Sequence, residues 1–264
     1  MKRTLDVMAG RIAALLQTQS PSLYLYGSAV LDDFRPGWSD IDILCLTQTA
    51  ISPQQAGKLL CLRQALSAEF PEVPHFRCFE GGFLSLGAFL SGEPDRVVYW
   101  GSSGQRIADR HIFDSFAMWE LLHDGALLYG AEIRAQLTEP SYAALLRDTA
   151  RHYEAIRSYA AKTRRGIRSC GWLLDIARGV YTVRTGRVIA KTAAGEWALA
   201  NGLCPDPETM ERALLVRKAP RRFDGDEDTL NWSETLGGAI QRFADVLEAE
   251  LAAVQTEGFV LPNK

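Results

Sequence analysis

The sequence lacks the cysteine and histidine patterns that mark disulfide frameworks and zinc sites. Its five cysteines are scattered without a CxxC pair, and its four histidines show no metal-ligand spacing. An odd, dispersed set of cysteines is typical of reduced thiols in a cytosolic protein. Basic residues are not in excess either. The net charge is −3, which argues against bulk nucleic-acid binding because such proteins usually carry a basic footprint.

Long apolar runs are also missing. No stretch approaches the roughly 20 apolar residues that a membrane-spanning helix needs. The N-terminal segment has helical spacing and a polar break at Arg11, unlike a signal peptide. We therefore expect a cytoplasmic protein without a membrane partner. The 264 residues, 47% of them hydrophobic, are enough for one or two globular domains.

The most informative stretch is residues 23–46, in which two apolar, strand-like runs flank a polar turn. The first run ends at Gly27-Ser28, and the second begins with Asp40 and Asp42. Residues two apart on a strand point to the same face, so these carboxylates repel each other unless a cation lies between them. Their hard oxygens suit Mg²⁺. A strand that breaks at Gly-Ser offers backbone N–H groups to a phosphate, so the pattern predicts a magnesium–nucleotide site.

Capping aspartates on a surface turn are the alternative, but they explain neither two carboxylates on one face nor the upstream Gly-Ser. Through Gly27-Ser28 and Asp40-x-Asp42 the chain resembles the DNA-polymerase-β-like nucleotidyltransferase superfamily. The stretch LYGSAV…SDIDIL is most similar to the aminoglycoside adenylyltransferases that modify streptomycin and spectinomycin. The resemblance implies ATP as co-substrate, Mg²⁺ on Asp40 and Asp42, and phosphates held by Gly27, Ser28 and Ser39.

The family carries a third carboxylate on the strand beside the Asp-x-Asp strand, where it takes the proton from the acceptor hydroxyl. Residues 75–80 are a strand candidate, and Glu80 is the best match. Glu72 is the rival, but Pro71 and Pro74 place it in a loop. The other interpretation of Glu80 is an exposed residue at a strand end.

Helical spacing predicts helices over residues 5–17 and 53–70, and again over 114–128. The resemblance implies that an acidic residue near the start of the third helix faces the nucleotide, and Asp114 matches it. An N-cap role for Asp114 fits equally well.

Strand signals vanish near residue 138. We expect five further helices packed as a bundle, at residues 142–165, 169–185, 192–201, 207–217 and 232–255. The predicted fold class is therefore α+β. A nucleotidyltransferase domain with a mixed sheet and helices covers residues 1–138. An all-α bundle that closes on the nucleotide and holds the acceptor covers residues 139–264.

A second resemblance lies between residues 175 and 199, where Arg178, Thr185-Gly186, Lys191 and Trp197 match features of the adenylyltransferases. The resemblance assigns Lys191 to the phosphates and Arg178 to the interdomain site. Lys191 also precedes a helix start, where free N–H groups favour anions. The alternatives are a solvated lysine and an arginine on a helix surface.

The implied reaction is Mg²⁺-dependent transfer of AMP from ATP to a hydroxyl of a small acceptor, with an aminoglycoside-type antibiotic as the leading candidate. We expect a monomer without a nucleic-acid partner. An adenylyltransferase for another metabolite or for a protein side chain is the alternative. A non-catalytic nucleotide sensor is a third possibility, against which Asp40, Asp42 and Glu80 argue. Residues 200–232 do not follow the family, so the sequence does not define the acceptor.

Overall fold

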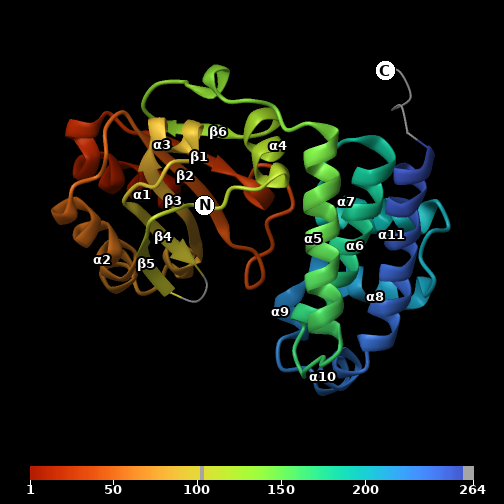
Figure 1. Ribbon diagram of the computed structural model, residues 1–264. Helices are drawn as coiled ribbons and strands as arrows, with labels where there is room; N and C mark the ends of the chain where they lie inside the picture. Colours follow the sequence, from red (N-terminus) through yellow and green to blue (C-terminus); the bar gives the residue numbers. More distant parts are fainter. Residues whose placement is uncertain (102–103, 258–264) are drawn as a thin grey trace. The chain divides into compact units, whose positions relative to one another are not determined.

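The computed structural model describes residues 1–101 and 104–257, which form two compact units (Figure 1). Unit 1 comprises residues 1–32 and 39–139. Unit 2 comprises residues 33–38 together with the chain from Pro140 onward. The chain therefore passes between the units three times. The sequence analysis placed one change of character at residue 138 and did not anticipate that residues 33–38 belong with the helices.

Unit 1 is built on a mixed sheet with the strand order β5-β4-β3-β2-β1-β6. β2 and β3 run parallel, and every other neighbouring pair is antiparallel. The strands are β1 (Ser22–Tyr26), β2 (Ile41–Thr47), β3 (Phe79–Ser85), β4 (Val97–Gly101), β5 (Gly104–Ala108) and β6 (Ala126–Tyr129). This arrangement confirms the predicted mixed sheet.

Four α-helices and four 3₁₀ helices complete the described part of unit 1. The α-helices are α1 (Lys2–Leu16), α2 (Pro53–Glu69), α3 (Leu86–Ser91) and α4 (Ser115–His123). The 3₁₀ helices are η1 (Gln17–Gln19), η2 (Gly27–Ala29), η3 (Pro74–Cys78) and η4 (Arg134–Gln136). The start of α2 follows from its sequence, because Ser52 and Gln55 form a capping box and Pro53 occupies the first turn.

Strand alternation divides the buried residues of unit 1 between the two faces of the sheet. One face carries Tyr24, Leu44 and Leu84, which pack with Leu121 of α4. On the other face, the indole of the fully buried Trp100 donates a hydrogen bond to a carbonyl of α2. Asp42 and Glu80 have the same parity as Leu44 and Leu84, so they lie on the α4 face of the sheet.

Two secondary-structure predictions for unit 1 are wrong in part, and one strand was not predicted. The strand expected at residues 75–80 begins only at Phe79, because Pro74 opens a 3₁₀ helix there. The helix expected at residues 114–128 ends at His123, and residues 126–129 instead form the edge strand β6 beside β1. Strand β5 was not predicted, because its sequence has no clear apolar alternation, and none of its five residues is buried in the structure.

The described residues of unit 2 form helices and the segments between them and no strand, as expected. Its helices are α5 (Tyr142–Ala160), α6 (Arg168–Thr185), α7 (Lys191–Ala200), α8 (Pro207–Lys218), α9 (Pro220–Phe223), α10 (Glu227–Glu234) and α11 (Gly237–Glu257). The helix predicted over residues 142–165 ends five residues early, at Ala160. The single helix predicted over residues 232–255 is wrong, because a break separates α10 from α11.

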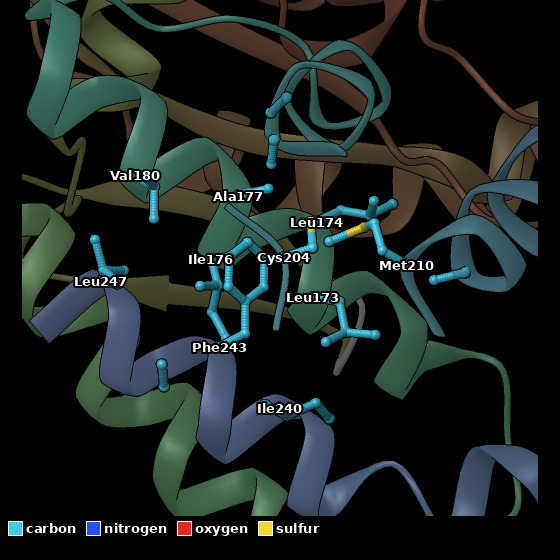
Figure 2. Close-up of a cluster of buried hydrophobic side chains, with 14 of the residues drawn as sticks. Leu173, Leu174, Ile176, Ala177, Val180, Cys204, Met210, Ile240, Phe243 and Leu247 are labelled. Carbon is cyan, nitrogen blue, oxygen red and sulfur yellow. The ribbon is translucent and has the colours of Figure 1, made fainter. Parts of the chain in front are cut away.

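Helix α6 is the centre of unit 2. Its buried side chains contact several neighbouring helices, and Figure 2 shows Ile176 and Val180 facing Phe243 and Leu247 of α11. Apolar surface removed from water in this way contributes most of the free energy of folding. None of the described helices is long and apolar enough to cross a membrane.

Candidate active site

The turn after β1 brings Gly27 against Asp42. Strands β1 and β2 return on each other as a hairpin-like pair, in which Tyr26 lies opposite Asp42. Gly27 has a φ of +71°, and a Cβ at this position would lie 2.3 Å from Oδ2 of Asp42. Only glycine fits this approach without displacing the carboxylate. The sequence interpretation of Gly-Ser and Asp-x-Asp as one site agrees with this contact.

Glu80 is the register partner of Asp42 on the neighbouring parallel strand. Directly opposed residues of adjacent strands have side chains in contact range. The hydroxyl of Tyr99, from β4, donates a hydrogen bond of 2.7 Å to Oε1 of Glu80. Asp42, Glu80 and Tyr99 thus come from three adjacent strands and gather on one face of the sheet.

Three further residues predicted for unit 1 lie between the end of β1 and the start of β2. Ser28 is part of η2, and Asp40 is an exposed residue immediately before β2. Ser39 is buried. Among the described residues, no group of three or more Asp, Glu, His or Cys side chains is arranged to hold a metal ion. A metal on Asp40 and Asp42 would therefore need further oxygen ligands from a nucleotide or from water.

The charges that act on the phenol of Tyr26 are mainly negative. Burial raises the pKa of Tyr26 well above its usual value, and the charges of Asp42, Glu120, Asp114 and Glu80 raise it further, in that order. These four carboxylates thus lie near one side chain. Burial and the bond to Glu80 similarly raise the pKa of Tyr99 to about 12. Both tyrosines are neutral hydrogen-bond donors at neutral pH.

Asp114 is the N-cap of α4, where its side chain accepts a 2.9 Å hydrogen bond from the N–H of Ala117. This contact agrees with the capping interpretation and leaves the nucleotide interpretation untested. Glu120 lies on the same helix and is buried. The sequence analysis missed Glu120, although a carboxylate within the apolar stretch Trp119-Glu120-Leu121-Leu122 is a recognisable signal.

His111 and Arg63 were also missed. A Cβ at Gly82 would lie 2.7 Å from the imidazole of His111, so the ring covers the sheet two residues beyond Glu80. Burial lowers the pKa of His111 to about 4, and the ring is neutral at pH 7. Arg63 of α2 donates to the carbonyls of Phe79 and Gly101. Burial lowers its pKa, against the opposing charges of Glu80 and Asp40.

In unit 2, Lys191 and Arg178 share one carboxylate. Nζ of Lys191 lies 2.8 Å from Oδ1 of Asp175, and an Nη of Arg178 lies 3.5 Å from the same oxygen. Burial raises the pKa of Asp175, but the two cations outweigh burial and bring it below its usual value. Lys191 is the first residue of α7. The two cations named by the sequence analysis therefore form one cluster in unit 2.

One expectation about α7 needs correction. The sequence analysis described free N–H groups beside Lys191 as a phosphate site. The N–H of Thr192, the next residue, instead donates to Oδ2 of Asp33 at 3.3 Å. The carboxylate of Asp33 therefore occupies this N–H group. An anion at the start of α7 would have to bind other groups of the first turn.

Two protein-family models match parts of the chain. Residues 12–78 match the nucleotidyltransferase domain, and residues 141–250 match the C-terminal domain of aminoglycoside adenylyltransferases. No curated protein matches the sequence. The two models fall on the sheet unit and on the helical unit in turn.

A solved structure has a similar fold along almost the whole chain. It is the spectinomycin adenyltransferase AAD(9) from Enterococcus faecialis, determined with ATP and spectinomycin. The TM-score is 0.63 at 16% sequence identity, and the match covers 92% of this chain and 98% of that one. Together with the two family matches, this likeness supports nucleotidyl transfer as the general activity. The chain is thus an enzyme, a nucleotidyltransferase that resembles the aminoglycoside adenylyltransferases.

Proposed function

We propose that the protein transfers AMP from ATP to a hydroxyl of an aminoglycoside-type antibiotic, with Asp40 and Asp42 holding Mg²⁺. The observation that carries the proposal is the register pair of Asp42 and Glu80 beside Gly27. One carboxylate then serves the metal while its neighbour handles a proton. The hard oxygens of Asp40 and Asp42 suit Mg²⁺, which would neutralise charge on the α-phosphate and on the departing pyrophosphate.

In this reaction Glu80 is the general base. The acceptor hydroxyl attacks the α-phosphorus as its proton passes to Glu80, a new phosphorus–oxygen bond forms, and the bond to pyrophosphate breaks. The hydroxyl of Tyr99 fixes one carboxylate oxygen of Glu80 and leaves the other to receive the proton. Gly27, Ser28 and Ser39 are assigned to the phosphates.

Asp114, Arg178 and Lys191 complete the set of assigned residues. Lys191 is assigned to the pyrophosphate, because a triphosphate carries more negative charge than one divalent ion offsets. Arg178 lies in the same ion cluster and is assigned to the nucleotide with it. For Asp114 we keep a nucleotide contact as a hypothesis in addition to its capping bond.

The charges of unit 1 favour a cationic acceptor. Glu80, Asp114 and Glu120 all lie near Tyr26, and none of them is assigned to the metal. Clustered carboxylates attract the protonated amines that aminoglycosides carry. The solved relative, AAD(9), was determined with spectinomycin, which belongs to the same broad class of drug.

The test is magnesium-dependent release of pyrophosphate from ATP, with streptomycin, spectinomycin and further aminoglycosides as acceptors. We expect release that requires one acceptor and disappears in Asp42→Asn. Glu93→Gln is the matched control, because Glu93 is an exposed carboxylate of the same unit, outside the proposed site. Binding of Mg–ATP without release for any drug would overturn the antibiotic assignment. Metabolite and protein acceptors would then be the candidates.

A further inference from the structure

Asp33 is a buried carboxylate held by helices that are far from it in sequence. It is only 3% exposed. The hydroxyl of Thr192 donates to its Oδ1 at 2.5 Å, and the N–H of Thr192 donates to its Oδ2. Arg217 of α8, also 3% exposed, donates at 3.1 Å to Oδ2 and to the carbonyl of Asp33. Every one of these contacts lies within unit 2.

The rest of the segment 33–38, which we term the connector, packs on the same helices. Trp38 joins the hydrophobic core of unit 2, and a Cβ at Gly171 of α6 would lie 3.2 Å from its ring. The guanidinium of Arg217 lies 5.4 Å from the centre of the Trp38 ring. Gly37, with a φ of +91°, lies against Arg221 of α9. Helices α6, α7, α8 and α9 therefore all contact the connector.

Burial of this pair is costly, which indicates a purpose beyond closing a loop. A buried carboxylate and a buried guanidinium both lose their hydration, and hydrogen bonds return only part of that cost. Nε of Arg217 is buried without a hydrogen-bond partner in the described structure. Ordinary loops stay at the surface and avoid such groups. The connector is thus ordered by specific polar contacts rather than by apolar burial alone.

The connector lies inside the nucleotide motif. Asp33 follows Ser28 by five residues, and Trp38 precedes Asp40 by two. The connector also contacts the start of α7, because the hydroxyl of Thr192, the residue after Lys191, donates to Asp33. Both halves of the Gly-Ser and Asp-x-Asp motif are therefore joined through a segment that belongs to the helical unit.

We propose that Asp33 is a positioning residue that fixes the connector to α7 and α8 and thereby orders both ends of the nucleotide motif. The inference rests on the proposed function for its catalytic meaning. Asp33 touches neither the Asp42–Glu80 pair nor the Lys191 cluster among the contacts described above. It acts through the chain on Ser28 and Asp40, and through Thr192 on the first turn of α7.

Hydrogen exchange followed by mass spectrometry tests this role without any nucleotide. The N–H groups of Val30 and Leu31 bond to the carbonyl of Gly27, and that of Trp38 bonds to the carbonyl of Arg35. We expect Asp33→Asn to speed exchange of these amides by about tenfold or more, because the charge facing Arg217 is lost. Thr192→Ala removes only the hydroxyl donor, and serves if Asp33→Asn does not fold.

Ser233→Ala is the matched control, because Ser233 is another fully buried polar residue of unit 2, and its hydroxyl bonds with residues 164, 166 and 230 rather than with the connector. It should lower the melting temperature without changing exchange in residues 28–42. The Kd for Mg–ATP should rise about tenfold in Asp33→Asn and stay unchanged in Ser233→Ala. Unchanged exchange in both Asp33→Asn and Thr192→Ala overturns the proposal. A wild-type protein that does not bind Mg–ATP instead overturns the proposed function, whatever the exchange shows.

Discussion

The two units arrange their charged residues by different means. In the sheet unit, Asp42 and Glu80 are neighbours because the register of two parallel strands sets them opposite each other. In the helical unit, Arg178 and Asp175 lie one turn apart on α6, and the packing of α7 against α6 brings Lys191 to the same carboxylate. A parallel pair of strands therefore aligns two carboxylates through its register, whereas the cation cluster combines a one-turn spacing on α6 with the packing of α7. Substitutions at the carboxylates of the sheet unit should mainly lower kcat, whereas substitutions in the cation cluster of the helical unit should mainly raise the KM for ATP.

The largest effect is expected for Glu80→Gln in the sheet unit. The amide keeps the size of the side chain and the hydrogen bond to Tyr99 but does not accept a proton at neutral pH. Loss of a general base typically lowers kcat by about 10²–10⁴-fold. The Kd for Mg–ATP should change little, which calorimetry can measure. Full activity in this variant would remove Glu80 from the mechanism.

Lys191→Met tests the helical unit. A charge-assisted bond to phosphate contributes about 1.5–3 kcal/mol, so we expect the KM for ATP to rise about 10- to 100-fold with a smaller change in kcat. Lys218→Met is the matched control, because Lys218 forms an exposed ion pair with Glu196 in the same unit. Equal KM values for the two variants would mean that Lys191 is an ordinary surface lysine.

The pH dependence of the free energy of unfolding should show a contribution from His111, which belongs to the sheet unit. Its pKa falls from 6.5 to about 4 on folding, so the unfolded chain binds more protons between these values. Stability contributed by this neutral ring is complete above pH 6.5 and is lost as the pH falls toward 4. Between pH 7.5 and 5 the loss is at most about 2 kcal/mol.

Denaturation with urea at both pH values measures this term as the difference between wild type and His111→Gln. The variant should lose less stability on acidification than the wild type, since its side chain does not titrate. The same acid sensitivity in both proteins would show that carboxylates elsewhere account for the whole pH dependence.

The smallest effect is expected for Tyr99→Phe. The substitution removes the 2.7 Å bond to Glu80 and leaves the ring over which Arg106 lies. Loss of one hydrogen bond typically costs about 0.5–1.5 kcal/mol, so kcat should fall by about 2- to 10-fold with an unchanged KM for ATP. A decrease as large as that of Glu80→Gln would make Tyr99 part of the proton transfer itself.

Local patterns in the sequence predicted how several of the candidate residues lie, whereas the roles proposed for them stay predictions. Alternation along β2 identified Asp42, and the Gly-Ser turn located the contact that Gly27 makes with it. The general fold class was also predicted, because the strands are apolar and the second half has helical spacing. Glu80 was chosen correctly as the residue beside Asp42, although its strand begins later than expected.

The remaining features depend on packing that no local pattern encodes. Asp175 lies on α6 as one of many polar residues, and only the fold brings Lys191 to it. The lowered pKa of His111 follows from its burial against Gly82, which the loop sequence does not reveal. Residues 32–37 have the composition of an exposed turn, because acidic residues, proline and glycine are common in loops. The sequence therefore did not indicate that Asp33 is buried.

The three passages of the chain between the units limit how this enzyme can be divided or recombined. A fragment that ends at Glu139 would keep residues 33–38, including the ion pair of Asp33 with Arg35, but would lose Thr192 and Arg217, and so would expose Asp33 and the ring of Trp38. A fragment that starts at Pro140 would lack the tryptophan that packs beside Gly171. Exchange of helical halves between related enzymes would therefore succeed only if the six residues 33–38 travel with them.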